Sequence, residues 1–296
     1  MRKIIAKILC LFLSGKVKKL QKQGNSILCI YGHDQQAEPF EKLVKYFLCK
    51  GYRFITPEEL CKYVSGTEKV NEKLVWLSFD DGWLSNYTDV LPVLKKYNVP
   101  ATIFVATKGI EDGYYWFTQV FQNLDSTLYE NVDVLWHLDN IKRVELIDKL
   151  PKYKGQRCTM NTEELKEMTQ SGLVSWGNHT HDHVMSDHCT NDELRGEIEK
   201  CSKVMMNITG NDCSFIYSYP NGNYDERTVG ILKDYGFSMA ATTNPGATPI
   251  PSDCFKIPRN EFKNGCLEEN ILQCYALWTP FFDKLKHILG LNTPRL

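Results

Sequence analysis

The chain of 296 residues lacks the features that mark several classes of protein. Its formal net charge is −1, so no excess of positive charge attracts nucleic acid, and nucleic acid is not an expected partner. Its cysteines number 11, an odd count, and none stands in a Cys-x-x-Cys pair. This pattern argues against a disulfide framework and against a structural zinc cluster, and it fits a reducing compartment. We interpret the cysteines as small buried apolar side chains.

The N-terminus also lacks the run of about 20 apolar residues that a membrane span needs. Residues 4–13 are apolar except for Lys7, and three lysines follow within residues 16–19. We interpret residues 1–24 as a short amphipathic helical segment, for which peripheral contact with a membrane is one role. An uncleaved export signal is the alternative, although a signal peptide has a cleaner apolar region and fewer lysines after it. We therefore expect a cytoplasmic protein, with or without membrane association, and export as the alternative location.

A short apolar stretch that ends in two acids is the first feature with chemical content. Residues 75–79 (VWLSF) read as a buried strand, and Asp80, Asp81 and Gly82 follow directly. A buried carboxylate must be hydrogen-bonded, paired or bound to a metal. Neighbouring side chains on a strand point to opposite faces, so both acids face one cleft only if the chain already turns at Gly82. Taken alone, this pattern favours the simpler interpretation, an acidic turn after a strand.

Residues 176–183 (WGNHTHDH) hold three of the seven histidines within five positions. A neutral imidazole is the commonest side-chain metal ligand, and a carboxylate from elsewhere completes a facial site with open positions. His179 and His183 share one face if the segment is a helical turn, and His181 then points elsewhere. Together with the two acids, this cluster indicates a metal or catalytic site.

Three segments resemble the motifs of the polysaccharide deacetylase family (NodB-homology, carbohydrate esterase family 4). Residues 78–82 (SFDDG) are similar to its first motif, usually Thr-Phe-Asp-Asp-Gly, and residues 179–183 (HTHDH) to its second, His-(Ser/Thr)-x-x-His. Residues 217–222 (YSYPNG) are similar to its third motif, which ends in Pro-x-Gly. The motifs occur in the family's order and extend over about residues 27–262.

With this resemblance, we expect Asp81, His179 and His183 to hold a divalent metal ion and to leave positions for water and substrate. Zinc is the expected ion, with cobalt and nickel as alternatives. Asp80, kept off the metal, is the expected general base that deprotonates the water. A backbone N–H in the turn around Asn221 is the expected donor to the oxyanion, as the family's third motif implies.

Two departures from the family pattern affect the remaining roles. Many members have an arginine at the position of Ser218, where it supports the catalytic aspartate, and this chain has none there. Arg259 either provides that charge beside Asp80 or is an ordinary surface or carboxylate-paired arginine. Many members also have a late histidine as the acid, but this chain has no histidine between residues 188 and 287. His33, which follows an apolar strand at residues 27–31, is therefore the candidate acid that protonates the leaving amine.

Strand and helix patterns alternate along most of the chain. We expect strands at residues 27–31, 75–79, 101–106, 173–177, 215–219, 237–241 and 255–257. Expected helices are residues 40–48, a helix capped by Thr56 with Pro57 in its first turn, 87–97, 162–170 (capped by Thr162), 192–206 and 225–235. The order predicts an α/β fold, an irregular (β/α)7-type barrel, as the resemblance also implies.

The expected division is an N-terminal segment (1–24), a catalytic domain (25–265) and a C-terminal helical tail (266–296), which either closes the base of the barrel or lies on a membrane surface. An insertion at about residues 108–157 contains an aromatic cluster at residues 114–117 (YYWF). That cluster is either a platform for sugar rings or part of a small core of its own. Trp83 and Trp176 flank the motifs and either line a sugar groove or fill the core.

The expected function is metal-dependent hydrolysis of N-acetyl groups on an amino-sugar polysaccharide or oligosaccharide, with that N-acetylated glycan as the partner. The alternatives are a carbohydrate-binding relative without activity and a hydrolase of the same fold that acts on another amide or ester. The sequence indicates no oligomeric state.

Overall fold

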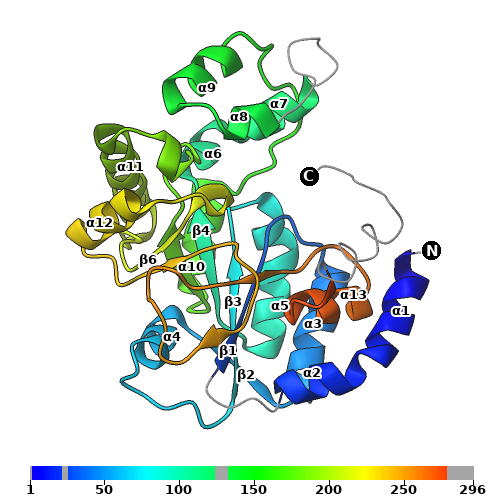
Figure 1. Ribbon diagram of the computed structural model, residues 1–296. Helices are drawn as coiled ribbons and strands as arrows, with labels where there is room; N and C mark the ends of the chain where they lie inside the picture. Colours follow the sequence, from blue (N-terminus) through cyan, green and yellow to red (C-terminus); the bar gives the residue numbers. More distant parts are fainter. Residues whose placement is uncertain (1, 22–25, 124–132, 279–296) are drawn as a thin grey trace.

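The structure, a computed structural model, describes residues 2–21, 26–123 and 133–278. At its centre lies a sheet of parallel strands, each joined to the next by a connection that contains at least one helix (Figure 1). These strands are β1 (Ser26–Gly32), β2 (Tyr52–Ile55), β3 (Lys73–Phe79), β4 (Ala101–Val105), β5 (Val174–Asn178), β6 (Ile216–Ser218) and β7 (Met239–Ala241). The connecting helices outside the insertion are α3 (Ala37–Cys49), α4 (Pro57–Val64), α5 (Leu91–Tyr97), α10 (Thr162–Gln170), α11 (Asn191–Thr209) and α12 (Glu226–Asp234).

The sheet has the order β7-β6-β5-β4-β3-β1-β8, and β2 pairs with the first half of β3. β8 (Thr248–Pro249) is antiparallel to β1, whereas β9 (Asn260–Glu261) is parallel to it. Between β8 and β9, Ile257 bridges to Ala241 of β7. One short segment therefore contacts both ends of the row of strands, and the sheet curls into a half-barrel. The prediction of an irregular strand-helix barrel is confirmed.

The central strands are buried on both faces because helices or loops cover them. In β3 every residue after Lys73 is buried, which explains the continuous apolar run read from the sequence. Trp76 is fully buried, and its indole N–H donates to Thr102 Oγ1 at 3.0 Å. Trp176 is also buried, and its indole N–H donates to Thr169 Oγ1 at 2.9 Å. Trp176 is thus a core residue and does not line a groove.

Several local expectations differ from the structure. Residues 255–257 form no strand, and only Ile257 makes a bridge, because the extended pairing lies three residues later in β9. Strand β2 was not predicted, because it is only four residues long. Helix α10 is capped by the side chain of Asn161, not by Thr162, whereas α4 has Thr56 as its cap and Pro57 in its first turn, as predicted. The helix expected at 87–97 begins with a π-helical turn, Asn86–Val90, before α5.

The insertion between β4 and α10 contains α6 (Thr107–Asp112), α7 (Trp116–Gln122), α8 (Asp133–Trp136) and α9 (Asn140–Ile147). It has a small apolar core of its own, which includes Tyr115, Trp116 and Phe117. One of these rings, Phe117, also lines the cleft described below. The aromatic cluster therefore fills a core and presents one edge to the site.

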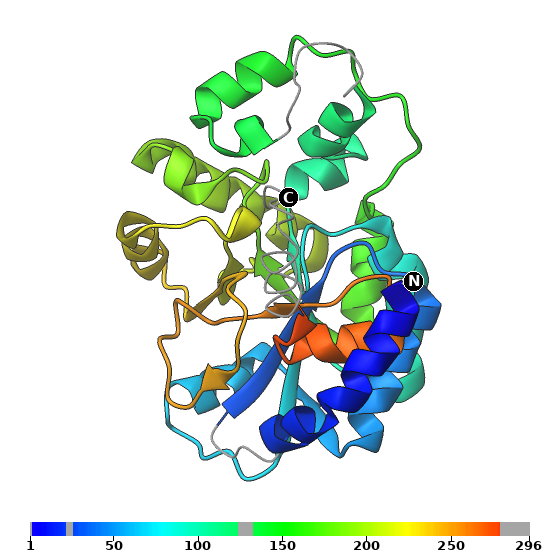
Figure 2. The same ribbon diagram turned by 45° about the vertical axis from the view of Figure 1, so that its right-hand side comes forward.

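The N-terminal segment forms α1 (Arg2–Phe12) and α2 (Ser14–Gln21), and α13 (Leu267–Cys274) packs against α1 and α3 (Figure 2). The expected C-terminal tail is described only to residue 278, and the rest lies outside the described residues. None of the described helices is long and apolar enough to cross a membrane. All 11 cysteines are free thiols; five are buried, five are half-buried and Cys49 is exposed.

Candidate active site

A cleft of about 380 Å³ lies at the carboxyl ends of the parallel strands, among the loops that follow them. It brings together side chains from widely separated segments. Its lining consists of Tyr31, His33, Asp80, Asp81, Trp83, Phe117, Phe121, Trp136, His179, His183, Asn221, Thr243 and Glu261. Six of the seven residues predicted for the site lie in this lining, and the seventh, Arg259, lies directly behind Asp80.

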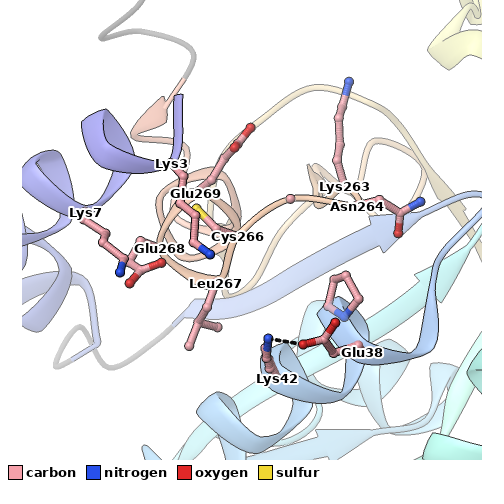
Figure 3. Close-up of a pocket in the computed structure, with 12 residues that line it drawn as sticks. Lys3, Lys7, Glu38, Lys42, Lys263, Asn264, Cys266, Leu267, Glu268 and Glu269 are labelled. Carbon is pink, nitrogen blue, oxygen red and sulfur yellow. Dashed lines mark hydrogen bonds and ion pairs between the residues drawn. The ribbon is translucent and has the colours of Figure 1, made fainter. Parts of the chain in front are cut away.

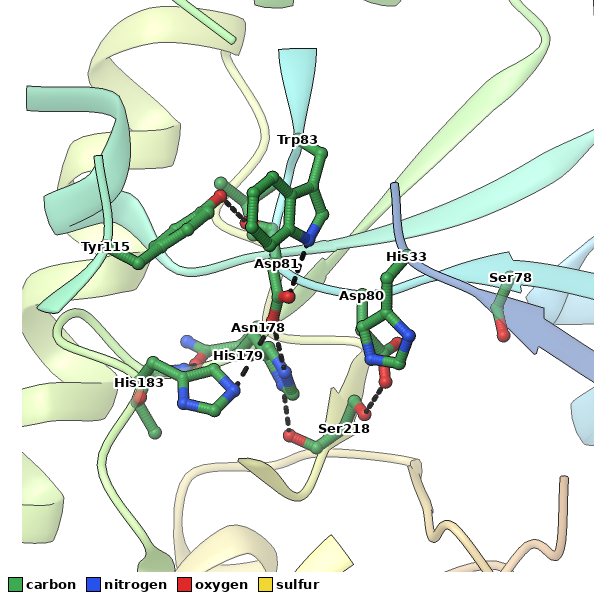
Figure 4. A network of polar contacts seen from close by, with 12 residues as sticks. His33, Ser78, Asp80, Asp81, Trp83, Tyr115, Asn178, His179, His183 and Ser218 are labelled. Atoms are coloured by element: carbon green, nitrogen blue, oxygen red, sulfur yellow. Dashed lines mark hydrogen bonds and ion pairs between the residues drawn. The ribbon is translucent and has the colours of Figure 1, made fainter. Parts of the chain in front are cut away.

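The two acids after β3 both line the cleft because the backbone turns at the second of them. Asp81 has a φ of 75° and Gly82 a φ of 98°, so the turn begins at Asp81, one residue earlier than expected. The Tyr115 hydroxyl donates to the carbonyl oxygen of Asp81 at 2.8 Å, and the Trp83 indole N–H donates to Asp81 Oδ2 at 2.8 Å (Figure 4). A left-handed aspartate is uncommon, and these two contacts hold it.

The two outer histidines of the second motif converge on Asp81 without forming a helical turn. Residues 179–183 are a loop in which Thr180 and His183 have φ values of 64° and 48°. The Nε2 atoms of His179 and His183 each lie 3.3 Å from Asp81 Oδ1. The middle histidine, His181, points away, and its Nδ1 lies 2.9 Å from Thr107 Oγ1. The expected pairing of the outer histidines thus arises from loop conformation and not from helical spacing.

The chemistry of these three side chains fits a divalent metal ion. His179 Nδ1 lies 2.8 Å from the Ser218 carbonyl, which only accepts, so Nδ1 carries the proton and Nε2 presents a lone pair in the neutral ring. Asp81 Oδ1 is buried and has no hydrogen-bond partner among the described residues. One donor atom from each of Asp81, His179 and His183 lies within 4.8 Å of the other two. A cation between them satisfies an otherwise costly group of buried acceptors.

Electrostatics keep this group in the protonation states that a metal needs. Burial raises the pKa of Asp81, but the two histidines beside it outweigh this effect and hold the pKa well below its usual range. Burial lowers the pKa of His183, and the attraction of Asp81 offsets only part of that change. The carboxylate is therefore ionised and the His183 imidazole is neutral at neutral pH, as metal ligation requires.

Asp80 is held by Arg259, which directly precedes β9. This arginine supplies the positive charge that many family members have at the position of Ser218. Arg259 is fully buried, and its Nη1 and Nη2 donate to the two carboxylate oxygens of Asp80 at 2.7 Å each. The other donors go to Ser78 Oγ (3.1 Å), Ser218 Oγ (2.8 Å) and the Thr242 carbonyl (3.1 Å). All five N–H groups of the guanidinium thus have acceptors. Arg259 thus lies beside Asp80, where the first of its two interpretations placed it, and it is not an ordinary surface arginine.

The pairing with Arg259 keeps Asp80 ionised. Burial raises the pKa of Asp80, but the charge and hydrogen bonds of Arg259 more than compensate, and the pKa lies below its ordinary value. Asp80 is therefore ionised at neutral pH and is able to accept a proton. Ser218 contacts both the base and a histidine of the site: its hydroxyl contacts Asp80 and Arg259, and its carbonyl orients His179.

His33 faces the cleft from the end of β1 and pairs with Glu261 of β9. Its Nδ1 lies 3.4 Å from Glu261 Oε1, and its side chain is 38% exposed. Burial lowers the pKa of His33, but the Glu261 carboxylate, together with Asp81 and Asp80, raises it overall to about 9. His33 is thus protonated at neutral pH. Glu261 was not among the predicted residues, because it meets His33 only when β9 pairs alongside β1, and no local pattern signals that pairing.

The third motif forms a tight turn at the cleft. Asn221 has a φ of 55° and lines the cleft, and the amides of Gly222 and Asn223 donate to the Tyr219 and Pro220 carbonyls. Gly222 has a φ of 77°, and a Cβ there would lie 2.0 Å from Thr243 Oγ1, so only glycine fits. With its neighbours engaged inside the turn, Asn221 is the residue of this motif that is placed to contact a ligand.

Aromatic rings form the opposite wall, and most come from the insertion. The rings of Phe117 and Trp136 lie 5.2 and 6.0 Å from that of His183. Phe121 is 53% exposed at the cleft. Trp83 also lines the cleft, as one of its two interpretations held. Aromatic faces offer flat apolar contact area of the kind that packs on a sugar ring.

Comparison with known proteins agrees with this arrangement. The model of the polysaccharide deacetylase family matches residues 67–240, more than half of the chain, including both acids after β3, the histidine loop and Asn221. The chain belongs to the polysaccharide deacetylase family. His33, Arg259 and Glu261 lie outside the matched range, so their roles depend on the geometry alone.

Two relatives of this family member are similar in sequence. The Bacillus subtilis protein YxkH, named as a polysaccharide deacetylase, is 30% identical over 220 residues, which are 74% of this chain and 62% of that protein. The poly-beta-1,6-N-acetyl-D-glucosamine N-deacetylase of Staphylococcus aureus is 25% identical over 252 residues, which are 83% of this chain and 72% of that protein.

Solved structures share the fold. The Streptococcus pyogenes deacetylase PplD, in complex with acetate, has a TM-score of 0.63 at 21% identity, and the match covers 85% of this chain and 99% of that chain. IcaB from Ammonifex degensii has a TM-score of 0.62 at 22% identity and covers 86% of this chain and 98% of that one.

Proposed function

We propose that this polysaccharide deacetylase family member is a metal-dependent hydrolase that removes N-acetyl groups from an amino-sugar polysaccharide or oligosaccharide. The observation that carries the proposal is the buried donor set of Asp81, His179 and His183 beside an ionised Asp80 in one cleft. The name of the Staphylococcus aureus relative supports an N-acetylglucosamine polymer as the substrate class. The aromatic wall supports a sugar ring as the group that binds beside the acetamide.

Asp81, His179 and His183 would hold the ion, for which we propose zinc, with cobalt or nickel as alternatives. When bound, the ion polarises the acetamide carbonyl and lowers the pKa of water. Asp80 takes the proton of the attacking water, because Arg259 keeps its carboxylate ionised and oriented.

The remaining residues stabilise charge and complete the proton balance. The backbone N–H of Asn221 donates to the oxyanion that develops on the carbonyl. His33, protonated at neutral pH through Glu261, gives its proton to the leaving nitrogen as the C–N bond breaks. Water and the N-acetyl sugar thus yield acetate and the free amine.

The test is acetate release from N-acetylglucosamine oligomers by chelated protein supplied with zinc, cobalt or nickel. We expect metal-restored release in the wild type and a loss of about 10²- to 10⁴-fold in Asp80→Asn, which keeps the shape of the side chain but cannot accept the proton. A protein that binds metal but releases no acetate from any N-acetylated oligomer refutes the proposal. Release from a panel of other amides or esters in that case would favour a different substrate for the same site.

A further inference from the structure

The outer face of α1 carries a concentration of exposed apolar side chains. Ile4, Ile8, Leu11 and Phe12 are 63%, 48%, 76% and 82% exposed, and the last two are the most exposed large apolar side chains of the described residues. Their spacing of four, three and one places them along one side of the helix. No described element packs over this side, and α1 stands at the outer edge of the molecule in both views (Figures 1 and 2).

The opposite face of α1 belongs to the folded core. Ala6 and Leu9 are buried in the main apolar cluster, together with Val17 of α2 and residues of α13. Removal of this segment would expose apolar surface on α13. The helix is therefore a structural part of the domain. It presents a second apolar face that no described element covers, and its position is fixed by packing.

The charge around this face has one sign. The first acidic residue of the chain is Asp34, and residues 2–22 contain seven lysines or arginines. The lysines at 3, 7, 16, 18 and 19 are exposed. Lys3 and Lys7 line a hollow of about 910 Å³ beside α3 and α13, where Glu38, Glu268 and Glu269 are the acidic groups that face them (Figure 3). Those acids lie on the inner side of α1, between it and the domain.

We propose that the outer face of α1, with the basic segment that follows it, docks on a lipid bilayer that contains anionic phospholipids. An apolar stripe flanked by lysines suits the boundary between acyl chains and acidic headgroups, and it supplies the two signals that stable attachment of a peripheral protein needs. A second copy of the chain is a poor occupant, because pairing this face with itself would bring two uniformly basic segments together. The proposal does not depend on the proposed hydrolysis.

The test is flotation of the full chain with vesicles of phosphatidylcholine alone and of phosphatidylcholine with 30% phosphatidylglycerol. We expect binding to the anionic vesicles only, and weaker binding as salt is raised. The double variant Leu11→Glu/Phe12→Glu should reduce partitioning at least tenfold. Lys18→Gln should reduce it about fivefold, the effect of one charge near an anionic surface. Ile141→Glu is the matched control, because Ile141 is 60% exposed on α9, and it should bind as the wild type does.

Thermal unfolding and acetate release from soluble oligomers are measured on the same variants and should be unchanged. Absence of wild-type binding to anionic vesicles, or wild-type binding by the double variant, overturns the proposal. So does a wild-type dimer that the double variant converts to a monomer without any vesicle binding. A failure of acetate release in all proteins, with vesicle binding intact, would instead refute only the proposed hydrolysis.

Discussion

Arg259 offers a stringent test of how the site is built, because its guanidinium is fully buried and all five of its N–H groups are matched. Arg259→Lys keeps the charge but supplies three donors on a single nitrogen, so it cannot contact both oxygens of Asp80 and also reach two serine hydroxyls and a carbonyl. At least two buried acceptors lose their donors. At about 1–2 kcal/mol for each, we expect the free energy of unfolding to fall by about 2–4 kcal/mol.

Removing the charge of residue 259 should lower the free energy of unfolding further. Arg259→Ala leaves Asp80 buried without its partner, and we expect this free energy to fall by about 3–5 kcal/mol. The side chains of Arg259 and Asp80 are 0% and 3% exposed, so solvent screens their charges little. Urea unfolding followed by circular dichroism measures both losses. The control is Arg195→Lys, at a surface ion pair with Asp234 whose side chains are 37% and 63% exposed, where we expect less than about 0.5 kcal/mol.

The same variants are tested for acetate release and for recovery by an arginine placed at position 218. Each Arg259 variant should lower kcat/KM for acetate release by at least about 10²-fold, because the base loses its orientation. Ser218→Arg in the Arg259→Ala background places a guanidinium at the position that many family members use, and it should recover part of both stability and activity. If the free energy of unfolding of Arg259→Lys lies within 0.5 kcal/mol of the wild-type value and its activity is retained, the bidentate pair is not what holds Asp80.

The remaining predictions concern the acid, the metal and the aromatic wall. Glu261→Gln should move the alkaline limb of the kcat/KM profile from near pH 9 towards 6.5, because the raised pKa of His33 depends on that carboxylate; a limb that does not move contradicts the assignment. For the same reason, the stability contributed by His33 should be complete below about pH 6.5 and lost as the pH rises through 9, which urea unfolding against pH measures. Asp81→Asn should abolish zinc retention in equilibrium dialysis. It should also abolish the zinc-dependent stabilisation of the wild type, about 2.7 kcal/mol at 100 times Kd and measured as a rise in Tm; retained zinc would exclude Asp81 as a ligand. Phe121→Ala should raise KM for oligomers about fivefold with kcat unchanged, and an unchanged KM would show that no sugar ring stacks there.

The sequence by itself determined the alternation of strands and helices, the burial of the strand before Asp80 and the presence of a carboxylate-histidine site. These features depend on local patterns, namely an apolar run, a turn glycine and histidines close together in the chain. Thr56 and Pro57 also marked the start of a helix correctly, because a helix cap is a local hydrogen-bonding motif.

The tertiary structure decided which charges meet, including the pairing of Arg259 with Asp80 that the resemblance had left as one of two interpretations. Arg259 reaches Asp80 and Glu261 reaches His33 because the segment after β8 folds back along β1, a pairing across more than 170 residues that no local pattern encodes. The convergence of His179 and His183 follows from left-handed residues in a loop, which sequence spacing alone had suggested was a helical turn. The exposed face of α1 is likewise decided by the tertiary structure: its apolar residues are visible in the sequence, but only packing against α13 shows which of them stay exposed among the described residues.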